Sequence, residues 1–578
     1  MTKGVISGWR IMSLFCVFAL ITSAIGWRLV SFQVVGSERL QSQGRDFRVQ
    51  EQTLLPRRGL IRDRGGLVLA TNIPSTDIYV TPKKLTDRDR VRLAQELSAI
   101  LTIPLDTIYA RVNNTDVEWS LVARQLDDPT VAAIKARFPP KEHPEIVYQE
   151  VPKRTYPNGP FLSPLLGFTN AGGMGVYGVE GRYNDLVGGE PGILVAETDV
   201  ARQPLAFGQQ QYRAPVEGAD LSLTIDAAIQ RMAEDELTRT ISEQGALGGT
   251  ILVMDPNTGA ILASASAPSY DPNAFNRADP QSYLNPAVSA TYEPGSTFKI
   301  FTMAAGLQTG GITPQTTLVD NGFIKVDPDT LYNLDHKAWG PETMEQVLER
   351  SSNVGASYIA KRTGKENFYS MLRQFGMGQK TGVDLDGEEI GIVRWPDNPT
   401  TIWNPIDLYT NSFGQGLTVT PLQMVTAASA IANGGTLYTP YVVGRIERHG
   451  DLVQDHRPQP ARQVISPEVA ATVRQMMTEA THKALADKVN LPGYDIAAKT
   501  GTAQIPDPKT GRYVEDKTIA SIISFFPANK PLFTVLVKID QPKKNSLGGD
   551  VAAPALGRLA GELLRYAGVP PAPTTRKP

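Results

Sequence analysis

The longest apolar run of the chain lies close to its N-terminus. From Ile11 to Trp27 the chain continues for 17 residues without a charged side chain, and apolar residues extend it further. A helix needs about 20 residues to cross the hydrocarbon core of a bilayer, with a lower limit of about 17. Lys3 and Arg10 precede the run, which favours a cytoplasmic N-terminus. We therefore expect a cytoplasmic segment over residues 1–10 and a transmembrane anchor over residues 11–32.

A cleaved signal peptide is the alternative interpretation of this run. Its apolar core would be shorter, and no persuasive small-x-small cleavage site follows the run. Cys16, the single cysteine, lies inside the run after Leu14 and Phe15, so no intrachain disulfide can form and no lipidated cysteine is expected. No later segment is long and apolar enough to cross again. We predict a single-pass protein of the cytoplasmic (inner) membrane, with everything after about residue 33 extracytoplasmic (periplasmic).

Residues 33–217 show short strand-like runs separated by turn residues. In residues 58–70 two such runs surround a glycine-containing turn, and residues 86–102 have the spacing of an amphipathic helix. A glycine-rich stretch from Gly175 to Gly192 contains Glu180. No serine, lysine or histidine pattern typical of catalysis occurs here, so we predict a structural, mixed domain.

The pattern changes near residue 220. Leu221–Ile225 alternates like a strand, and Asp226 then occupies an N-cap position before a helix that runs through Leu237. Two further strand-like runs, Gly249–Asp255 and Gly259–Ala265, are joined by Pro-Asn-Thr and predict a hairpin.

Two more strands are predicted near the C-terminus, Ile519–Phe526 paired with Leu532–Ile539. Strands at both ends with helical patterns between them indicate one α/β domain over residues 218–566. The proline-rich tail, residues 567–578, is predicted to be disordered.

A serine and a lysine three residues apart provide the first candidate for chemistry. Pro294-Gly295 breaks the chain before an apolar helical run, which places Ser296 in the first turn of a helix. Unpaired amides there favour a developing anion. Lys299 lies on the same face one turn later and could activate the serine if burial or another cation lowers its pKa. Alone, the pair is equally typical of a helix cap beside an exposed lysine.

A second polar segment, Arg350–Gly355, contains Ser351 and Asn353. Two residues apart, they could present both side chains to one cleft, with Ser351 relaying a proton and Asn353 bonding a peptide amide. By itself the segment could equally be a polar turn.

Lys-Thr-Gly occurs three times, and only one copy suits a catalytic cleft. Lys380 follows a glycine-rich loop, and Lys509 lies in a predicted hairpin turn. The copy at Lys499 follows Tyr494–Ala498, which is predicted to be a strand entering the sheet. A small Gly501 at a strand edge would let a peptide approach the backbone. The residues that could then grip a substrate carboxylate are Lys499, Thr500 and Thr502.

Composition excludes several other classes. The chain has 578 residues with a net charge of −2, which indicates more than one domain and no basic field for nucleic acid. None of its five histidines lies in the three segments, so a Ser-His-Asp triad is not expected. It also lacks a Walker loop, an HExxH motif and a Cys/His cluster, so we expect no nucleotide, metal or other cofactor.

The three segments, in this order, resemble the penicillin-binding transpeptidase family. Other segments extend the resemblance to its class B members: Gly414–Gln423, Gly548–Pro554, Arg58–Gly65, Arg154–Gly159 and Gly178–Tyr183. The resemblance implies an α/β (α+β) fold. A mixed α+β pedestal, similar to a dimerisation domain, would precede a transpeptidase domain similar to serine β-lactamases, with a central antiparallel sheet flanked by helices.

The resemblance also implies a function, which is D,D-transpeptidation of peptidoglycan stem peptides that end in D-Ala-D-Ala, with acylation by β-lactams. It assigns Ser296 as nucleophile, Lys299 as base, Ser351 as proton relay, Asn353 as a ligand of the donor peptide, Lys499 with Thr500, Gly501 and Thr502 as its carboxylate-binding strand, and the amides of Ser296 and Thr502 as oxyanion donors.

Class B members carry no glycosyltransferase, so the resemblance implies a separate SEDS-type glycosyltransferase partner. Ser351-Ser352-Asn353 is more similar to division-type members than to the elongation type, which remains an alternative. A β-lactamase, a β-lactam sensor and a catalytically silent scaffold are the further alternatives.

Overall fold

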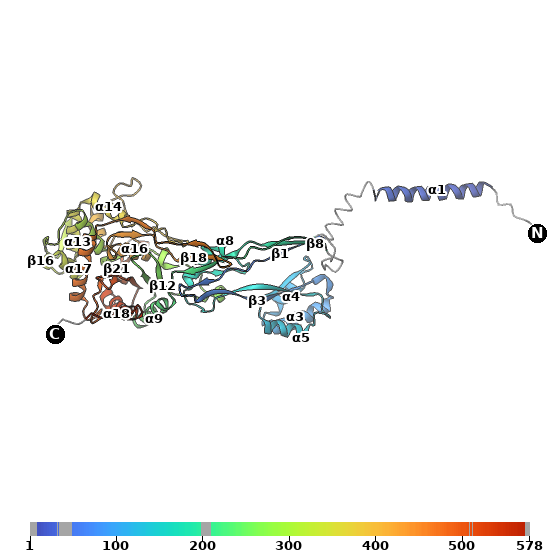
Figure 1. Cartoon of the computed structure of the whole chain (residues 1–578), viewed down its shortest axis with the longest axis horizontal. Coiled ribbons are helices and arrows are strands. Elements are labelled where there is room, and N and C mark those ends of the chain that lie inside the picture. Colours follow the sequence, from blue (N-terminus) through green and yellow to red (C-terminus); the bar gives the residue numbers. More distant parts are fainter. Residues whose placement is uncertain are drawn as a thin grey trace, which may run out of the picture. The chain divides into compact units, whose positions relative to one another are not determined.

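The computed structural model describes residues 8–31, 33, 49–197, 210–489, 491–507, 509–510 and 512–572 (Figure 1). Its contacts divide the chain into two compact units, which are described separately. The first combines residues 1–57 with 189–217, and the second combines residues 58–188 with 218–578. The predicted borders of the pedestal and transpeptidase domains remain predictions, and residues 573–578 of the predicted tail lie outside the described part.

The first unit contains α1, Gly8–Val30, and a small antiparallel sheet. α1 overlaps the predicted anchor, and none of its residues is buried against protein. By length and composition it could cross a membrane. The sheet has the order β1-β8-β9, with the bounds Val49–Leu54, Gly192–Glu197 and Gln210–Arg213.

In the second unit, residues 58–188 contribute most of a seven-stranded sheet. The strand pair predicted over residues 58–70 is confirmed, because β2 (Ile61–Arg62) pairs antiparallel with β3, although β3 continues to Val80. The predicted helix is also confirmed as α3, Asp87–Leu101. The remaining elements are η2 (Pro82–Lys84), α4 (Leu105–Val112), β4 (Ser120–Leu126), α5 (Asp128–Arg137), β5 (Ile146–Thr155), α6 (Ser163–Leu166), β6 (Phe168–Thr169), β7 (Gly175–Val176), α7 (Gly178–Arg182) and α8 (Asn184–Gly188).

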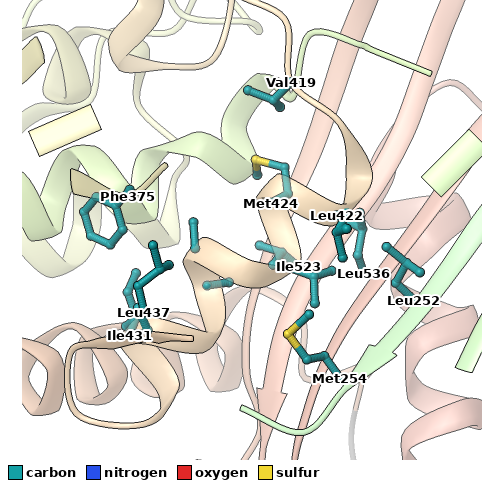
Figure 2. Close-up of a cluster of buried hydrophobic side chains, with 14 of the residues drawn as sticks. Leu252, Met254, Phe375, Val419, Leu422, Met424, Ile431, Leu437, Ile523 and Leu536 are labelled. Carbon is teal, nitrogen blue, oxygen red and sulfur yellow. The ribbon is translucent and has the colours of Figure 1, made fainter. Parts of the chain in front are cut away.

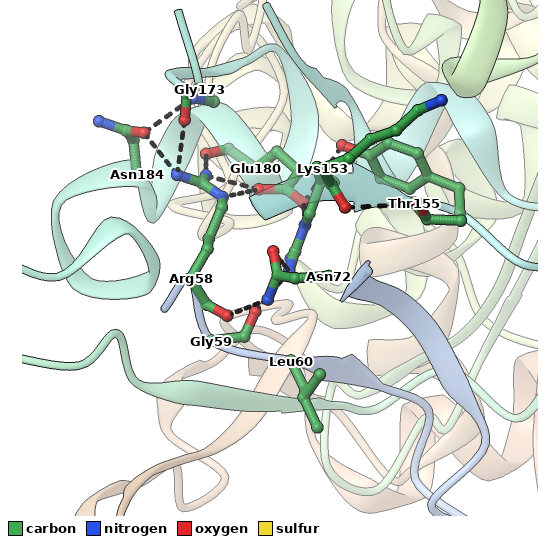
Figure 3. Close-up of polar contacts among 12 residues, drawn as sticks. Arg58, Gly59, Leu60, Asn72, Lys153, Thr155, Gly173, Glu180 and Asn184 are labelled. Atoms are coloured by element: carbon green, nitrogen blue, oxygen red, sulfur yellow. Dashed lines mark hydrogen bonds and ion pairs between the residues drawn. The ribbon is translucent and has the colours of Figure 1, made fainter. Parts of the chain in front are cut away.

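A buried ion cluster centres on Glu180 of α7 (Figure 3). Its two carboxylate oxygens accept hydrogen bonds from Arg58 Nε (2.8 Å) and Arg154 Nε (2.7 Å), and none of the residue is exposed. Burial alone would raise the pKa of Glu180, but the charges of Arg154 and Arg58 outweigh it and hold that pKa below its ordinary value. The glycine-rich stretch therefore contains the centre of a buried ion cluster, which is consistent with the structural role predicted for this region.

The C-terminal part of the second unit, residues 218–578, contains a five-stranded antiparallel sheet of order β12-β11-β23-β22-β21. Both predicted hairpins are confirmed: β11 pairs with β12, and β22 pairs with β23. The strands are β11 (Gly248–Met254), β12 (Ile261–Ala267), β21 (Ala497–Pro506), β22 (Tyr513–Phe526) and β23 (Phe533–Asp540).

Helices cover both faces of this sheet. On one face lie α9, Ala227–Gln244, and α18, Gly548–Tyr566. The predicted N-cap of α9 is confirmed, since the Asp226 carboxylate accepts from the amides of Ala228 and Ile229. On the other face lies α16, Pro421–Ala432, in which every residue is buried. It begins with a capping box between Thr420 and Gln423, and its apolar side chains join those of the strands in one core (Figure 2).

The other elements of this part include three strands of the seven-stranded sheet. They are β10 (Asp220–Leu223), η3 (Pro272–Arg277), η4 (Pro280–Tyr283), α10 (Pro286–Ser289), η5 (Gly295–Phe298), α11 (Lys299–Gln308), β13 (Thr317–Asp320), β14 (Phe323–Val326), β15 (Asp329–Tyr332), β16 (Gly340–Thr343), α12 (Met344–Glu349), α13 (Asn353–Thr363), α14 (Lys365–Gln374), α15 (Pro405–Ser412), β17 (Thr436–Tyr438), β18 (Val443–Arg448), β19 (Asp451–Asp455), β20 (Pro460–Gln463) and α17 (Pro467–Ala484).

Candidate active site

Ser296 lies in η5, a single 3₁₀ turn that leads directly into α11. The sequence predicted that Ser296 lies in the first turn of a helix; its position is confirmed, and the structure shows that this turn is 3₁₀. Gly295 begins it with a φ of 57°, a left-handed conformation that suits glycine. Ser296 is half-buried at this turn, where helical amides remain free to face a ligand.

The nucleophile turn is held by a close approach of two glycines. The amide of Gly295 donates to the carbonyl oxygen of Gly414 at 2.9 Å. A Cβ atom on Gly414 would lie 2.2 Å from the carbonyl oxygen of Gly295, which no real contact permits. The predicted family segment that begins at Gly414 therefore serves to support Ser296.

Gly414→Ala should slow the labelling of Ser296 by a fluorescent penicillin by about 100-fold, because a displacement of this turn moves the reacting atom. Gly310→Ala is the matched control. Both glycines have a positive φ, 79° at Gly414 and 71° at Gly310, but a Cβ on Gly310 would meet nothing within 4 Å. Equal labelling of the two variants would show that the turn is not held in this way.

Lys299 is almost completely buried, with 1% of its surface exposed. Its ammonium nitrogen donates to Asn353 Oδ1 at 2.8 Å, to the carbonyl oxygen of Ser351, and to Ser351 Oγ at 3.3 Å. Burial lowers the pKa of Lys299 well below its ordinary value, and the charge of Lys499 lowers it further. A lowered pKa, which Lys299 needs in order to act as a base, is therefore present in the structure.

Lys499 reaches the same hydroxyl from the opposite side. It lies in β21 with 4% of its surface exposed, and its Nζ donates to Ser351 Oγ at 2.9 Å and to the carbonyl oxygen of Thr500 at 3.1 Å. Burial lowers the pKa of Lys499 to about 7. Ser351 Oγ thus lies between two buried lysines, both of which lose their protons far more easily than a lysine in water.

Ser351 has a backbone conformation that is unusual for a serine, with a φ of 57°. The next residue, Ser352, caps α13 by accepting from the amide of Gly355 at 2.7 Å. The tight turn before the helix points Ser351 and Asn353 toward Lys299, so the structure brings together the residues predicted from this segment.

A carboxylate network that no motif revealed lies beneath this turn. Asp320 is 1% exposed, and its Oδ2 accepts from Ser352 Oγ and from Asn333 Nδ2, both at 2.8 Å. Asn333 Oδ1 in turn accepts from the amide of Asn353 at 2.8 Å. The buried Glu342 also acts on Lys299 electrostatically, and burial raises the pKa of Glu342 to about 7. Asp320 and Asn333 stabilise the turn that carries Ser351.

The Lys-Thr-Gly copy at Lys499 does lie in a strand, although β21 begins only at Ala497. Thr502 Oγ1 accepts from the amide of Gly548 at 3.0 Å, which ties the second predicted family segment to the site. A Cβ on Gly501 would lie 2.7 Å from Ser521 Oγ and 2.8 Å from Thr297 Cγ2. The small size of Gly501 is thus needed for packing against the nucleophile turn, and its contact with a substrate remains a prediction.

The other two copies lie elsewhere. Lys380 and Thr381 are in a loop, where the amide and hydroxyl of Thr381 both donate to Glu388. Lys509 and Thr510 lie between β21 and β22, which form a hairpin as predicted; residue 511 is outside the described residues.

Comparisons with known proteins agree with this geometry. A model described as Penicillin binding protein transpeptidase domain matches residues 249–561, and one described as Penicillin-binding Protein dimerisation domain matches residues 53–223. Stage V sporulation protein D of Bacillus subtilis is 33% identical over 96% of this chain and 84% of its own length. Peptidoglycan D,D-transpeptidase FtsI of Escherichia coli is 30% identical over 97% of this chain and 92% of its own length.

Solved structures are similar as well. Penicillin binding protein 3 from Mycobacterium tuberculosis, complexed with aztreonam, superposes with a TM-score of 0.70 at 27% identity and covers 90% of this chain and 98% of its own. A peptidoglycan synthetase from Bifidobacterium adolescentis gives a TM-score of 0.72 at 25% identity and covers 92% and 99%.

Proposed function

This chain belongs to the class B penicillin-binding proteins, and we propose that it is a division-type peptidoglycan D,D-transpeptidase that cross-links stem peptides through an acyl-enzyme on Ser296. The observation that carries the proposal is the convergence of two buried lysines on Ser351 Oγ, because one of them, Lys299, lies one turn after Ser296. A structural serine cap would not require two buried ammonium groups, which are costly to remove from water.

In the first step Ser296 Oγ attacks the carbonyl carbon of the penultimate D-alanine, and Lys299 Nζ accepts the hydroxyl proton. The backbone amides of Ser296 and Thr502 hold the oxyanion, and each such donor contributes about 3 kcal/mol in other enzymes. The proton passes through Ser351 Oγ to the nitrogen of the departing D-alanine. The 3.3 Å between Lys299 Nζ and Ser351 Oγ supports this route.

The second step releases the peptide to an acceptor amine. That amine attacks the acyl carbon and loses its proton to Lys299, which returns it to Ser296 Oγ as the ester bond breaks. Asn353 orients the donor peptide, while Lys499, Thr500 and Thr502 bind its terminal carboxylate along β21, beside Gly501. A β-lactam mimics the donor and remains attached to Ser296.

The pKa of Lys499 predicts how acylation depends on pH. Below a pH of about 7 the buried ammonium is charged and can bind the carboxylate of a penicillin; above it the charge is lost. The second-order acylation rate should therefore fall as pH rises through about 7, while loss of the Lys299 proton sets the rise on the acid side. Lys499→Arg, which stays charged, should move the falling limb to higher pH. An unchanged limb would mean that another group titrates.

We also propose the topology and partner. A single crossing by α1 would place the chain that follows it outside the cytoplasm, and a SEDS-type glycosyltransferase would supply the glycan strands. Similarity to FtsI and to Stage V sporulation protein D favours a septal role over elongation. Depletion should then give filaments, whereas round cells would favour the elongation alternative.

Turnover of nitrocefin tests the proposed activity against its closest rival. A transpeptidase should open the ring of one equivalent of nitrocefin per chain by acylation and then stop, and it should release D-alanine from a pentapeptide donor. Rapid repeated hydrolysis without D-alanine release would identify a β-lactamase instead. An absence of both reactions, with Ser296→Ala as reference, would favour a silent scaffold.

A further inference from the structure

The carboxylate of Glu293 joins three segments that meet at the nucleophile turn. Glu293 lies three residues before Ser296. Its Oε1 accepts from the amide of Gly416 at 3.0 Å, and its Oε2 accepts from Tyr513 Oη, also at 3.0 Å. Gly416 belongs to the loop that supports the turn, and Tyr513 begins β22, the second strand of the hairpin that carries Lys499. The Glu293 side chain thus connects the loop that contains Gly416 with the β21–β22 hairpin. These two segments form the two walls of the site beside Ser296.

The two walls are attached to the nucleophile segment in different ways. On the loop side, the backbone of Tyr292 exchanges two hydrogen bonds of 3.0 Å with Val419, and Gly295 donates to Gly414. On the hairpin side, β21 packs closely, and a Cβ on Gly295 would lie 2.8 Å from the carbonyl oxygen of Thr502. Within the described part of the chain, no hydrogen bond other than that of Tyr513 joins the hairpin to residues 292–299.

Tyr513 acts on the part of the hairpin that contains an oxyanion donor. It pairs across the hairpin with Pro506, four residues beyond Thr502. The amides of Ser296 and Thr502 lie on opposite sides of this junction, so the distance between them depends on how closely the hairpin is held. Burial raises the pKa of the Glu293 carboxyl, and the bonds from Gly416 and Tyr513 and the charge of Arg394 oppose that rise.

We propose that Glu293 and Tyr513 form a clamp that holds the β21–β22 hairpin against the nucleophile turn and so sets the spacing of the two oxyanion donors. Both are positioning residues and neither touches the reacting atoms. The inference rests on the proposed function, because it concerns the acylation of Ser296. Opening of the clamp leaves Lys299, Ser351 and Lys499 in place, since their mutual hydrogen bonds do not involve it.

The test is the rate of acylation of the full chain by a fluorescent penicillin, measured at a series of concentrations. Tyr513→Phe removes only the hydroxyl and should lower the first-order acylation constant by about tenfold, the usual scale for a hydrogen bond to a charged group. The dissociation constant of the complex that precedes acylation should change much less, because Lys499, the charged group that binds the carboxylate, stays anchored to Ser351 and Thr500. A merely structural defect would not divide its effect in this way.

Tyr566→Phe is a matched control. Tyr566 Oη donates to Asp226 at 3.1 Å, again a tyrosine beside a carboxylate, and it has a similar exposure, 51% against 41% for Tyr513. It lies at the end of α18, away from the site, and its variant should acylate like the wild type.

A double-mutant cycle completes the test. Because Tyr513 acts through Glu293, the Glu293→Ala, Tyr513→Phe double variant should acylate no more slowly than Glu293→Ala alone. Two results would overturn the clamp when the wild type is labelled at Ser296. The Tyr513→Phe variant could acylate at the wild-type rate, or the double variant could show a loss equal to the product of the two single losses. Absence of labelling in the wild type would instead overturn the proposed function, and the clamp with it.

Discussion

Replacing Lys299 with methionine should lower the rate of Ser296 acylation by about 10⁴-fold, the upper range for loss of a general base. Methionine keeps the length of the side chain in its buried site, so the expected loss is chemical. The other buried lysine, Lys499, donates to Ser351 and Thr500, so these contacts do not place it to take over the role of Lys299. Stopped-flow labelling with a fluorescent penicillin measures the rate, and thermal melting checks the fold.

The other two Lys-Thr-Gly copies provide matched controls for the effect of removing a lysine. Lys380→Met and Lys509→Met change exposed lysines in a loop and a turn. Both variants should acylate at the wild-type rate. A Lys299→Met protein that folds and still acylates within tenfold of the wild type would show that the base is another group.

Glu180→Gln should lower the free energy of unfolding by about 3–5 kcal/mol, the range for breaking a buried ion pair by removing one partner. Glutamine has nearly the same shape, but it leaves the charges of Arg58 and Arg154 buried without a counter-charge. The side chains of the two arginines are 8% and 4% exposed, and that of Glu180 is fully buried. Urea denaturation of the full chain measures the loss.

An exposed pair offers the comparison. Asp397 receives two hydrogen bonds from Arg373, at 2.9 and 2.6 Å, but its side chain is 63% exposed. Solvent screens such a pair, so Asp397→Asn should cost less than about 1 kcal/mol. Similar losses in the two variants would contradict the view that burial makes the Glu180 cluster important.

The parts of the fold that could be predicted are those in which local pattern and tertiary structure agree. Asp226 signals a helix start because its side chain caps amides two and three residues away. The strand pairs are predictable for a similar reason, since short turns bring neighbouring runs together. The length of β3 was missed, because Pro74 and polar residues interrupt its pattern while β5 pairs with it to Val80.

The site was predictable where spacing along the chain carries the chemistry. Ser296 and Lys299 are one turn apart, and the choice of Lys499 among three copies depended on the strand that follows from its neighbours. The turn at Ser296 is 3₁₀ and not α-helical, because Gly295 adopts a left-handed conformation against Gly414, a contact between distant segments.

Asp320 and Glu293 could not be found from spacing. Asp320 supports Ser352 from 32 positions away, through β13, and no local pattern distinguishes it from other strand-end aspartates. Glu293 is adjacent to the motif, but its partners Gly416 and Tyr513 lie 123 and 220 positions away. The only available signal was the presence of an acidic residue beside Pro294, which is compatible with an ordinary turn.

The central claim is that Ser296 is the acylated nucleophile, and mapping of the penicillin adduct tests it most directly. The full chain is treated with a penicillin, its intact mass is measured, and the modified peptide is sequenced by mass spectrometry. We predict one adduct per chain, located on Ser296 and absent from Ser296→Ala. An adduct on another residue, or an undiminished adduct in the Ser296→Ala variant, would contradict the claim.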